Sequence, residues 1–212
     1  MNAIVDIYFD KNIGDDLMGE LIIESMTSKG WTCYIPQKDE FLIPDSIKNM
    51  DGVKFFKEIN KELLEVNTIK CYIKVGGSMF PHGSIIEGIK RFKVLSLIKM
   101  MKKRGVKIGI FGCSLGPFIS KVGVSATKKI IKLSDVITCR DRESFEFIKK
   151  VKPKNSHLYS DIVFGSDIQA SRNVRNDIGV SVYTGYAPYL KKFNSSYGSF
   201  LVNLLRGYSA GL

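Results

Sequence analysis

The sequence predicts a doubly wound α/β domain, in which parallel strands form a central sheet with helices on both faces. Short apolar runs alternate along the chain with helical segments of ten to twenty residues. The runs are apolar throughout, as expected of parallel strands buried on both faces. A chain of 212 residues, 44% of them apolar, is long enough to bury such a core.

The chain begins with a strand, a turn and a helix. Residues 3–9 are rich in β-branched and aromatic side chains, which predicts the first strand. A polar turn follows at residues 10–15. Asp15 or Asp16 can then cap a helix that runs to about residue 29, because aspartate is a preferred N-cap residue.

The middle of the chain predicts two strands and two helices. A second strand is expected at residues 31–36, and a polar stretch separates it from a helix at about residues 53–66. Residues 70–75 predict the third strand, which ends abruptly in a glycine pair. A long helix is expected from about residue 84 to residue 104, where Gly105 ends it in the way that a left-handed glycine commonly does.

The last predicted elements of the domain continue the alternation. Residues 107–111 predict a fourth strand that ends at Gly112. After it we expect a helix at residues 122–133, a strand at 136–139, a helix at 142–150 and a strand at 156–159. These strands complete a Rossmann-like sheet.

The remainder of the chain predicts a second domain. Residues 1–165 form the first domain, residues 166–177 a polar linker, and residues 178–212 the start of another Rossmann-like domain. Because the last segment has no room to complete a sheet, a truncated protein is expected. The alternative is a single compact domain whose last strand joins the first sheet.

Composition and charge limit the class of protein. No apolar run approaches the roughly 20 residues needed to cross a bilayer, and the first residues lack the pattern of a signal peptide, so a cytoplasmic protein is expected. Residues 1–68 hold 7 Lys/Arg and 13 Asp/Glu, a net charge of −6, whereas the remainder holds 25 and 8, a net charge of +17, which together give +11. The later part is expected to face an anionic partner, such as a phosphorylated substrate, an acidic glycan, a lipid surface or nucleic acid.

The four cysteines are expected to be buried thiols. Cys33, Cys71, Cys113 and Cys139 lie far apart, each in or beside an apolar run. A zinc site or a disulfide framework would require paired spacings that the sequence lacks. No bound metal is therefore expected.

Three predicted strands end in glycine-containing turns, at residues 12–16, 76–78 and 112–117. In an open parallel sheet, ligands bind beyond the carboxyl ends of the strands. Glycine at these ends lets backbone N–H groups approach an anion. A tight turn explains each one alone, but three turns at one edge predict a phosphate or carboxylate site. None matches the dinucleotide-binding or P-loop pattern.

Five motifs together resemble the polysaccharide pyruvyl transferase family. They are the NxGD turn at residues 12–15, the glycine loop at 76–78, the GCSLGP turn at 112–117, the stretch 140–144, similar to that family's RDxxS pattern, and residues 161–164, similar to its DxxF element. The resemblance covers residues 8–164. The second loop carries Ser78 where the family commonly has a third glycine.

The resemblance implies a particular architecture and reaction. It implies the first half of a glycosyltransferase-B-like protein, whose active site lies between two domains and whose donor-binding basic and histidine residues lie largely in the second. The implied reaction is attack of a sugar hydroxyl on C2 of phosphoenolpyruvate, with proton transfer to the methylene carbon and loss of phosphate. Phosphoenolpyruvate is thus the expected donor substrate, a glycan or lipid-linked glycan the acceptor, and no cofactor is expected. Activity of the chain without a complete second domain is left open.

The turns and the resemblance together give the candidate residues. Asp15, Arg140 and His82 are the catalytic candidates, and Arg140 can bind a carboxylate or phosphate through two hydrogen bonds. The residues expected to bind substrate are Asn12, Gly14, Asp16, Gly76, Gly77, Ser78, Gly112, Ser114, Gly116, Asp141 and Ser144.

Each catalytic candidate also has a structural interpretation. Arg140 and Asp141 can form an ion pair in which Asp141 caps the next helix. Asp15 can be a helix cap without any role in chemistry. His82 lies on a loop, where a histidine is commonly solvated.

The helix at residues 84–104 is strongly basic, and its charges have two interpretations. They can form a solvated polar face, or they can contact anionic lipid at the inner face of the membrane, where each basic residue contributes about 1 kcal/mol. Nucleic acid is not expected, because no aromatic–basic platform or helix-turn-helix pattern accompanies the charge.

Two other functions stay open. A nucleotide-sugar glycosyltransferase of similar architecture would carry comparable glycine loops. A non-catalytic module that binds a partner or a membrane surface would bind vesicles in a salt-dependent manner, without turnover. The sequence specifies neither the acceptor sugar nor an oligomeric state.

Overall fold

A computed structural model describes most of the first three quarters of the chain. The described residues are 1–9, 12–36, 42–57, 59, 63–64, 68–79, 85–116, 121–152 and 154–166, without the side chains of 78, 85–89 and 122. All of them belong to the first of two units into which the chain divides, Met1–Ile168 and Gln169–Leu212. The predicted linker beyond residue 166 and the predicted second domain lie outside the described residues and stay predictions.

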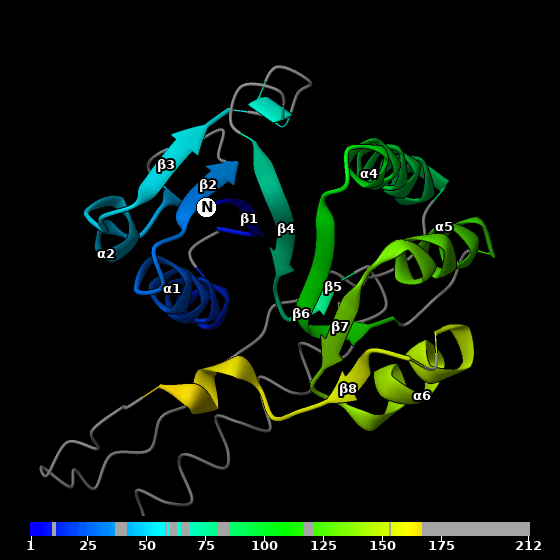
Figure 1. Cartoon of the computed structure of the whole chain (residues 1–212). Helices are drawn as coiled ribbons and strands as arrows, with labels where there is room; N and C mark the ends of the chain where they lie inside the picture. The colour runs from blue at the N-terminus through cyan, green and yellow to red at the C-terminus, as the bar shows by residue number, and fades with distance from the viewer. Residues whose placement is uncertain are drawn as a thin grey trace, which may run out of the picture. The chain divides into compact units, whose positions relative to one another are not determined.

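A sheet of seven parallel strands forms the centre of the first unit (Figure 1). The strand order is β3-β2-β1-β4-β6-β7-β8, and a short eighth strand, β5 (Ser78–Met79), pairs in parallel with the far end of β6. The seven strands are β1 (Asn2–Ile7), β2 (Thr32–Pro36), β3 (Val53–Phe56), β4 (Ile69–Val75), β6 (Lys107–Leu115), β7 (Val136–Cys139) and β8 (Ser156–Leu158). The prediction of a doubly wound, Rossmann-like sheet is confirmed.

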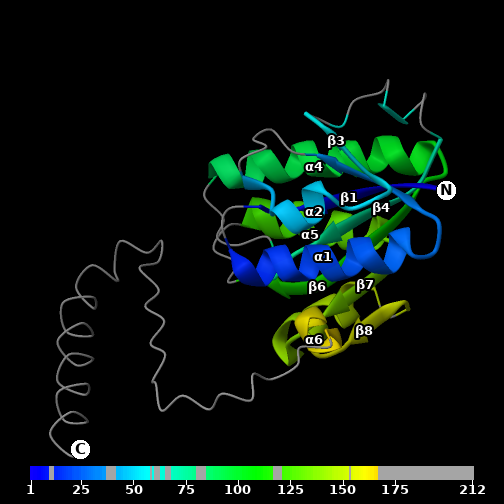
Figure 2. The same ribbon diagram turned by 90° about the vertical axis from the view of Figure 1, so that its left-hand side faces the viewer.

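Helices cover both faces of this sheet, and the strand order reverses between β1 and β4 (Figures 1 and 2). On one face lie α1 (Ile13–Thr27), α2 (Asp45–Lys48) and the 3-10 helix η2 (Ile162–Gly165); on the other lie α4 (Ile85–Lys103), α5 (Lys121–Leu133) and α6 (Arg142–Val151). Such a reversal opens a crevice at the carboxyl edge, where doubly wound folds bind ligands. Among the described residues, no helix is long and apolar enough to cross a membrane.

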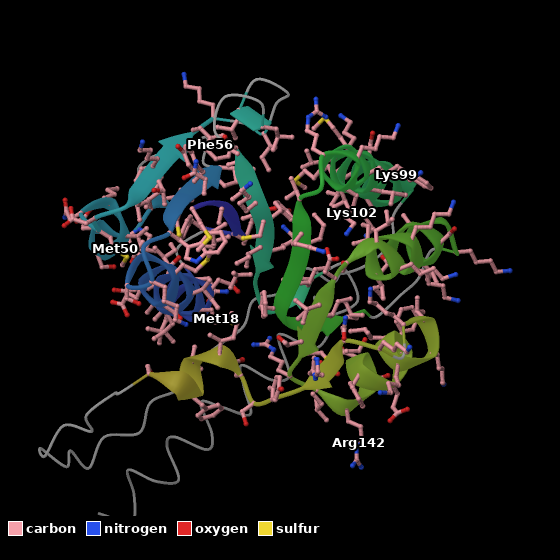
Figure 3. The ribbon with its side chains drawn as sticks, in the orientation of Figure 1. Met18, Met50, Phe56, Lys99, Lys102 and Arg142 are labelled. Atoms are coloured by element: carbon pink, nitrogen blue, oxygen red, sulfur yellow. The ribbon has the colours of Figure 1, made fainter. Side chains whose placement is uncertain are left out.

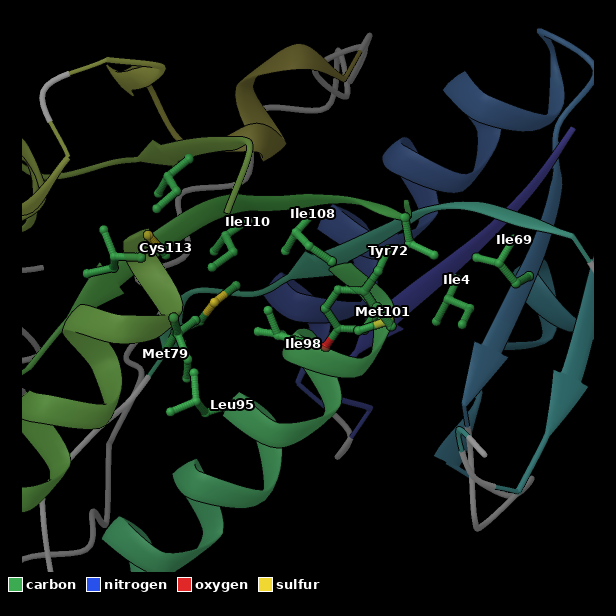
Figure 4. Packing of buried hydrophobic residues seen from close by; sticks show 14 of the residues in the cluster. Ile4, Ile69, Tyr72, Met79, Leu95, Ile98, Met101, Ile108, Ile110 and Cys113 are labelled. Carbon is green, nitrogen blue, oxygen red and sulfur yellow. The ribbon is translucent and has the colours of Figure 1, made fainter. Parts of the chain in front are cut away.

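Two apolar clusters hold the layers together, one on each face of the sheet. Strand residues alternate between them, so that Ile4 and Tyr72 face α4 whereas Val5 and Val75 face α1. Figure 4 shows Tyr72 beside Ile98 and Met101 of α4 in the first cluster. Full burial of a large apolar side chain contributes about 1.5–3 kcal/mol, so these clusters supply the main stabilisation of the domain.

The predicted burial of the cysteine thiols is confirmed for three of the four. Cys33, Cys113 and Cys139 are buried and Cys71 is half-buried, and all four are free thiols. Burial raises the pKa of Cys33 and of Cys71 to about 11. Both thiols are therefore neutral near pH 7.

Several predicted elements differ from the structure. Residues 53–56 were expected to start a helix, but they form β3, which pairs in register with β2 at the end of the sheet. Neither α2 nor β5 was predicted. The fourth predicted strand continues through Gly112 to Leu115, because Gly112 adopts a φ of +70° inside β6, where the pairing with β7 shifts register.

Helix α1 begins earlier than predicted. Its N-cap is Asn12, whose side-chain oxygen accepts a hydrogen bond from the backbone N–H of Gly14. The two aspartates that were expected to cap the helix, Asp15 and Asp16, lie in its first turn instead. There they interact favourably with the helix dipole and remain free to contact other elements.

Candidate functional site

The first two glycine-containing turns are joined by one carboxylate. Asp15 Oδ1 accepts a hydrogen bond of 3.1 Å from the backbone N–H of Gly77, which follows β4. Asp15 Oδ2 accepts a second bond of 2.7 Å, from the Asn12 side chain. Both oxygens of Asp15 therefore hold the start of α1 against the loop after β4.

The second and third turns are also joined directly. The carbonyl oxygen of Gly77 accepts a hydrogen bond of 2.7 Å from the backbone N–H of Ser114, and Ser78 pairs with Ser114 between β5 and β6. The Gly112 bulge that precedes Ser114 is fixed by Thr138 Oγ1, which accepts its N–H at 3.0 Å. The predicted meeting of the three turns at one edge of the sheet is confirmed.

Arg140 lies at the centre of this edge. Its Nε donates to Ser114 Oγ at 3.0 Å, and its Nη1 forms an ion pair with Asp161. A Cβ atom placed on Gly77 would lie 2.6 Å from Nη2, so only glycine allows the guanidinium to approach the loop this closely. The Arg140 side chain is 30% exposed, so a ligand can still reach it.

Asp141 is linked to Arg140 through Ser114, whose hydroxyl bonds to Asp141 and accepts from Arg140 Nε. It caps α6, as one of the predicted interpretations had it: Asp141 accepts hydrogen bonds from Ser144 N at 2.7 Å and Ser144 Oγ at 2.8 Å. Burial alone would raise the pKa of Asp141, but these bonds, a bond from the Ser114 side chain and the charge of Arg140 hold it below its usual value. Ser144 Oγ also accepts from Leu115 N at 2.7 Å, which fastens α6 to the end of β6.

Asp161 reaches Arg140 because η2 packs over the Gly112 bulge. Asp161 Oδ1 caps η2 by accepting from Val163 N at 3.3 Å, and its other oxygen pairs with Arg140. A Cβ on Gly112 would lie 2.8 Å from Ile162 Cδ1 and 3.6 Å from Met18 Sδ, so the absence of a side chain at Gly112 gives η2 its place beside α1. Sequence reasoning noted the motif at residues 161–164 but missed Asp161 as a site residue.

Asp16 differs from the other carboxylates of the edge. Its Oδ1 atom is buried, and none of the described residues hydrogen-bonds to it. Burial raises the pKa of Asp16, and the neighbouring carboxylates of Asp15 and Glu20 raise it further. The raised pKa means that the Asp16 carboxyl keeps its proton to a higher pH than an ordinary aspartate does.

The remaining predicted site residues are only partly described. Gly76 follows β4 directly and Gly116 follows β6, each beside residues of the network. His82 and the side chain of Ser78 lie outside the described residues, so the predicted roles of these two groups stay predictions.

A second polar group, which the sequence did not predict, lies between β1 and β4. Lys74 Nζ lies 2.9 Å from Asp6 Oδ2, and the same oxygen accepts the hydroxyl of the buried Tyr72. Burial, together with the Asp6 carboxylate, raises the pKa of Tyr72 well above its usual value, so this phenol stays protonated. Charged residues at paired positions of two otherwise apolar strands are the pattern that indicates such a group.

The described part of the edge brings an arginine together with carboxylates and two unactivated cysteines. Cys113 and Cys139 directly precede Ser114 and Arg140, but burial raises their pKa values to about 12 and about 11. Both are neutral thiols near pH 7 and hence weak nucleophiles. The described residues contain no group of three or more His, Cys, Asp or Glu side chains placed to hold a metal ion.

Comparisons with known proteins give a family. A family model described as polysaccharide pyruvyl transferase matches residues 12–209. Comparison with the curated proteins finds no match. One solved structure with similarity to this chain is yeast methylglyoxal/isovaleraldehyde reductase Gre2 complexed with NADPH, with 10% sequence identity and a TM-score of 0.40 over 66% of this chain and 55% of that one.

Proposed function

The chain belongs to the polysaccharide pyruvyl transferase family, and on this premise we propose that it transfers a pyruvyl group from phosphoenolpyruvate to a sugar hydroxyl of a cell-surface or exopolysaccharide precursor. The observation that carries the proposal is the guanidinium of Arg140, held at the carboxyl edge between Gly77, Ser114 and Asp161. A donor that bears both a phosphate and a carboxylate requires such a fixed positive charge.

In this proposal Arg140 binds the anionic part of the donor. Its Nε and Nη1 are already engaged by Ser114 and Asp161, so the cation is oriented before the ligand arrives. Preorganised charge of this kind lowers a barrier without reorganisation during the reaction. Backbone N–H groups of the glycine turns are suited to the second anionic group of the donor.

The reaction requires two proton transfers. The oxygen of one acceptor hydroxyl bonds to C2 of phosphoenolpyruvate and gives up its proton. The double bond between C2 and the methylene carbon becomes a single bond, and the methylene carbon takes up a proton to form a methyl group. A second hydroxyl oxygen then bonds to C2 as the bond from C2 to the phosphate oxygen breaks, and its proton leaves with inorganic phosphate. The product is a ketal of the two hydroxyls.

We assign proton handling to Asp16 and positioning to Asp15. Asp16 has a raised pKa and an oxygen that no described residue engages, which suits a group that gives and takes a proton. Both carboxylate oxygens of Asp15 already accept hydrogen bonds, from Gly77 N and from the Asn12 side chain. In this proposal the role of Asp15 is to hold the loop after β4, and the catalytic role predicted for it passes to its neighbour.

Titration calorimetry with phosphoenolpyruvate tests the donor, with Arg142→Ala as the matched control. Arg142 is also an arginine at the start of α6, but its side chain is exposed and extends outward from that helix (Figure 3). We expect Arg140→Ala to weaken phosphoenolpyruvate binding by about 10- to 100-fold, as loss of hydrogen bonds to a charged group does, and Arg142→Ala to leave it unchanged.

The other outcomes separate the alternative functions. Binding of a nucleotide sugar in place of phosphoenolpyruvate would identify a glycosyltransferase. Binding of neither, together with no phosphate release in the presence of acceptor glycans, would favour a non-catalytic module. Phosphoenolpyruvate binding that Arg140→Ala leaves intact would remove Arg140 from the site.

A further inference from the structure

Helices α4 and α5 each present an exposed stripe to solvent. On α4 the exposed positions Phe92, Ser96, Lys99 and Lys103 are spaced by four, three and four residues; on α5 Lys121, Ser125, Lys128 and Lys132 repeat the same spacing. Residues at this spacing lie along one side of an α-helix. Together we call these eight residues the α4–α5 surface.

The two stripes belong to neighbouring helices on the same face of the sheet. Helix α4 packs against α5, and both cover the apolar cluster that contains Ile98 and Ile130 (Figure 1). Figure 3 labels Lys99 on the outer side of α4 and Lys102 on the side nearer the sheet, where Lys102 forms an ion pair with Asp135. Lys99 therefore lies on the solvent side of α4, unlike Lys102.

The charge of these helices is almost entirely of one sign. In α4 six Lys/Arg residues accompany one acidic residue, Glu87, and α5 has four lysines and no acidic residue. By contrast, α1 on the opposite face carries three acidic residues, Asp15, Asp16 and Glu20, in its first two turns. Like charges on neighbouring helices repel one another, and an anionic partner reduces that repulsion.

Phe92 indicates which kind of anionic partner fits. It is a large apolar side chain that is 41% exposed, and Lys93 beside it is exposed as well. An exposed aromatic ring among lysines is typical of helices that lie on a bilayer, where the ring enters the headgroup region and the cations meet anionic lipid. A duplex nucleic acid offers no apolar layer at its phosphate surface to receive such a ring.

We infer that the α4–α5 surface docks the protein on a membrane that contains anionic lipid. Helices of this fold start at the carboxyl edge and run back along the sheet, so one end of the docked surface lies toward the edge where Arg140 lies. The inference rests on charge and exposure alone and does not require the proposed function.

Vesicle sedimentation tests the surface with the full chain. We expect binding to phosphatidylcholine vesicles that contain phosphatidylglycerol, none to phosphatidylcholine alone, and loss of binding at high salt. Replacing Lys99, Lys103, Lys121 and Lys132 with glutamine should weaken binding by about two orders of magnitude or more, because each lysine near anionic lipid contributes roughly fivefold. Lys128 is kept because its Nζ lies over the Phe147 ring, 5.9 Å from the centroid.

A matched variant separates the surface from net charge. The control variant has glutamine in place of four other exposed lysines, Lys29, Lys57, Lys70 and Lys154, which lie outside the α4–α5 surface. Its net charge equals that of the first variant, and its vesicle binding should stay within about twofold of the native chain. Equal loss in both variants, or no binding by the native chain, would overturn the inference. Phe92→Ala should weaken vesicle binding several-fold without weakening binding to double-stranded DNA. If the protein bound DNA as tightly as vesicles, and Phe92→Ala weakened neither, the surface would be a general polyanion-binding surface and the inference would be overturned.

Discussion

Each edge of the sheet holds a partly buried ion pair, and the two pairs have different surroundings. At the amino edge, Asp135 accepts hydrogen bonds from Lys102 Nζ at 2.9 and 3.0 Å and from Ile108 N at 2.7 Å. At the carboxyl edge, Arg140 is held by Ser114 and Asp161 and lies against Gly77. Both edges contain a partly buried ion pair, but at the carboxyl edge the cation lies against a strand-end loop, where a Cβ on Gly77 would be 2.6 Å from Arg140 Nη2.

Under the proposed function the Arg140 pair serves a ligand, whereas the Lys102 pair serves stability. Asp135 fastens α4 to the start of β6, and both members of its pair with Lys102 are 30% exposed. The carboxyl edge instead collects residues that follow β1, β4, β6, β7 and β8, and it includes an Asp16 oxygen without a hydrogen-bond partner among the described residues. The close approach of the Arg140 guanidinium to Gly77 is not needed to stabilise the fold, which supports the proposed role of this edge in binding a ligand.

The largest effect should come from filling the space above Gly77. In Gly77→Ala the new methyl group would lie 2.6 Å from Arg140 Nη2, so the guanidinium must move. Displacement of a binding group by about 1 Å commonly costs about 100-fold in rate, and we expect kcat/KM for pyruvyl transfer to fall by at least that factor. Gly165→Ala is the control, because a Cβ there would meet no atom within 4 Å. Equal activity in both variants would contradict the proposed position of Arg140.

A smaller effect should follow from loss of the carboxylate that orients Arg140. Asp161→Asn removes the charge of the ion pair but keeps the size of the side chain. We expect a roughly tenfold rise in KM for phosphoenolpyruvate with kcat little changed, which is the pattern of weakened donor binding. Asp161→Glu should recover part of the affinity. A fall in kcat alone would show that Asp161 acts in the chemical step and is not merely a positioning residue.

At the amino edge the corresponding change should affect stability and not activity. Asp135→Asn removes a partly buried ion pair and weakens the bond to Ile108 N. We expect a loss of about 1–2 kcal/mol in the free energy of unfolding, measured by urea denaturation. The exposed pair of Lys48 and Asp45 provides the comparison, since Asp45→Asn should cost less than about 0.5 kcal/mol. If Asp135→Asn lowered kcat/KM while leaving stability intact, the proposed division between the two edges would fail.

The smallest effect should appear in the dependence of stability on pH. Hydrogen bonds and neighbouring cations outweigh burial and lower the pKa of Asp135 below 3.8. A lowered folded-state pKa contributes stability that is present above the unfolded value and is lost as pH falls through the folded value. The unfolding free energy of Asp135→Asn should therefore decline less steeply below about pH 4 than that of the native chain. Parallel curves would show that Asp135 titrates normally in the folded state.

Asp16 should show the opposite sign. Its folded-state pKa is raised, chiefly by burial, so the folded state binds its proton more tightly than the unfolded state does. Its contribution favours folding most at low pH and declines as pH rises past 3.8 through the folded value. The unfolding free energy of Asp16→Asn should therefore fall less over this pH range than that of the native chain. Urea denaturation at a series of pH values measures the difference.

The sequence predicted the sheet well because its strands are apolar on both faces. It failed at residues 53–56, where Val53, Phe55 and Phe56 together with Ile59 and Leu63 have a spacing that also suits a helix. Pairing with β2 selects the strand at these residues, and that contact is not visible in local sequence. Gly112 was placed at a strand end because a glycine in a bulge and one in a turn look alike in sequence.

The candidate site was predicted as a set of turns but not as a network. Glycines after strands indicated the correct edge, since parallel strands bring their carboxyl ends together. The ion pair between Arg140 and Asp161 joins residues 21 positions apart, and it forms because η2 fits over the bulge at Gly112. No local pattern encodes that fit, so the pairing of Asp161 with Arg140 could be found only from the fold.

The place of β1 in the sheet has a consequence for synthesis on the ribosome. β1 pairs with β2 on one side and with Ile69–Val75 on the other. A nascent chain that has emerged only as far as β3 therefore leaves one side of its most buried strand without a partner, and bare strand edges are prone to join with other chains. Chaperone binding to the nascent chain is expected to decline once β4 has emerged.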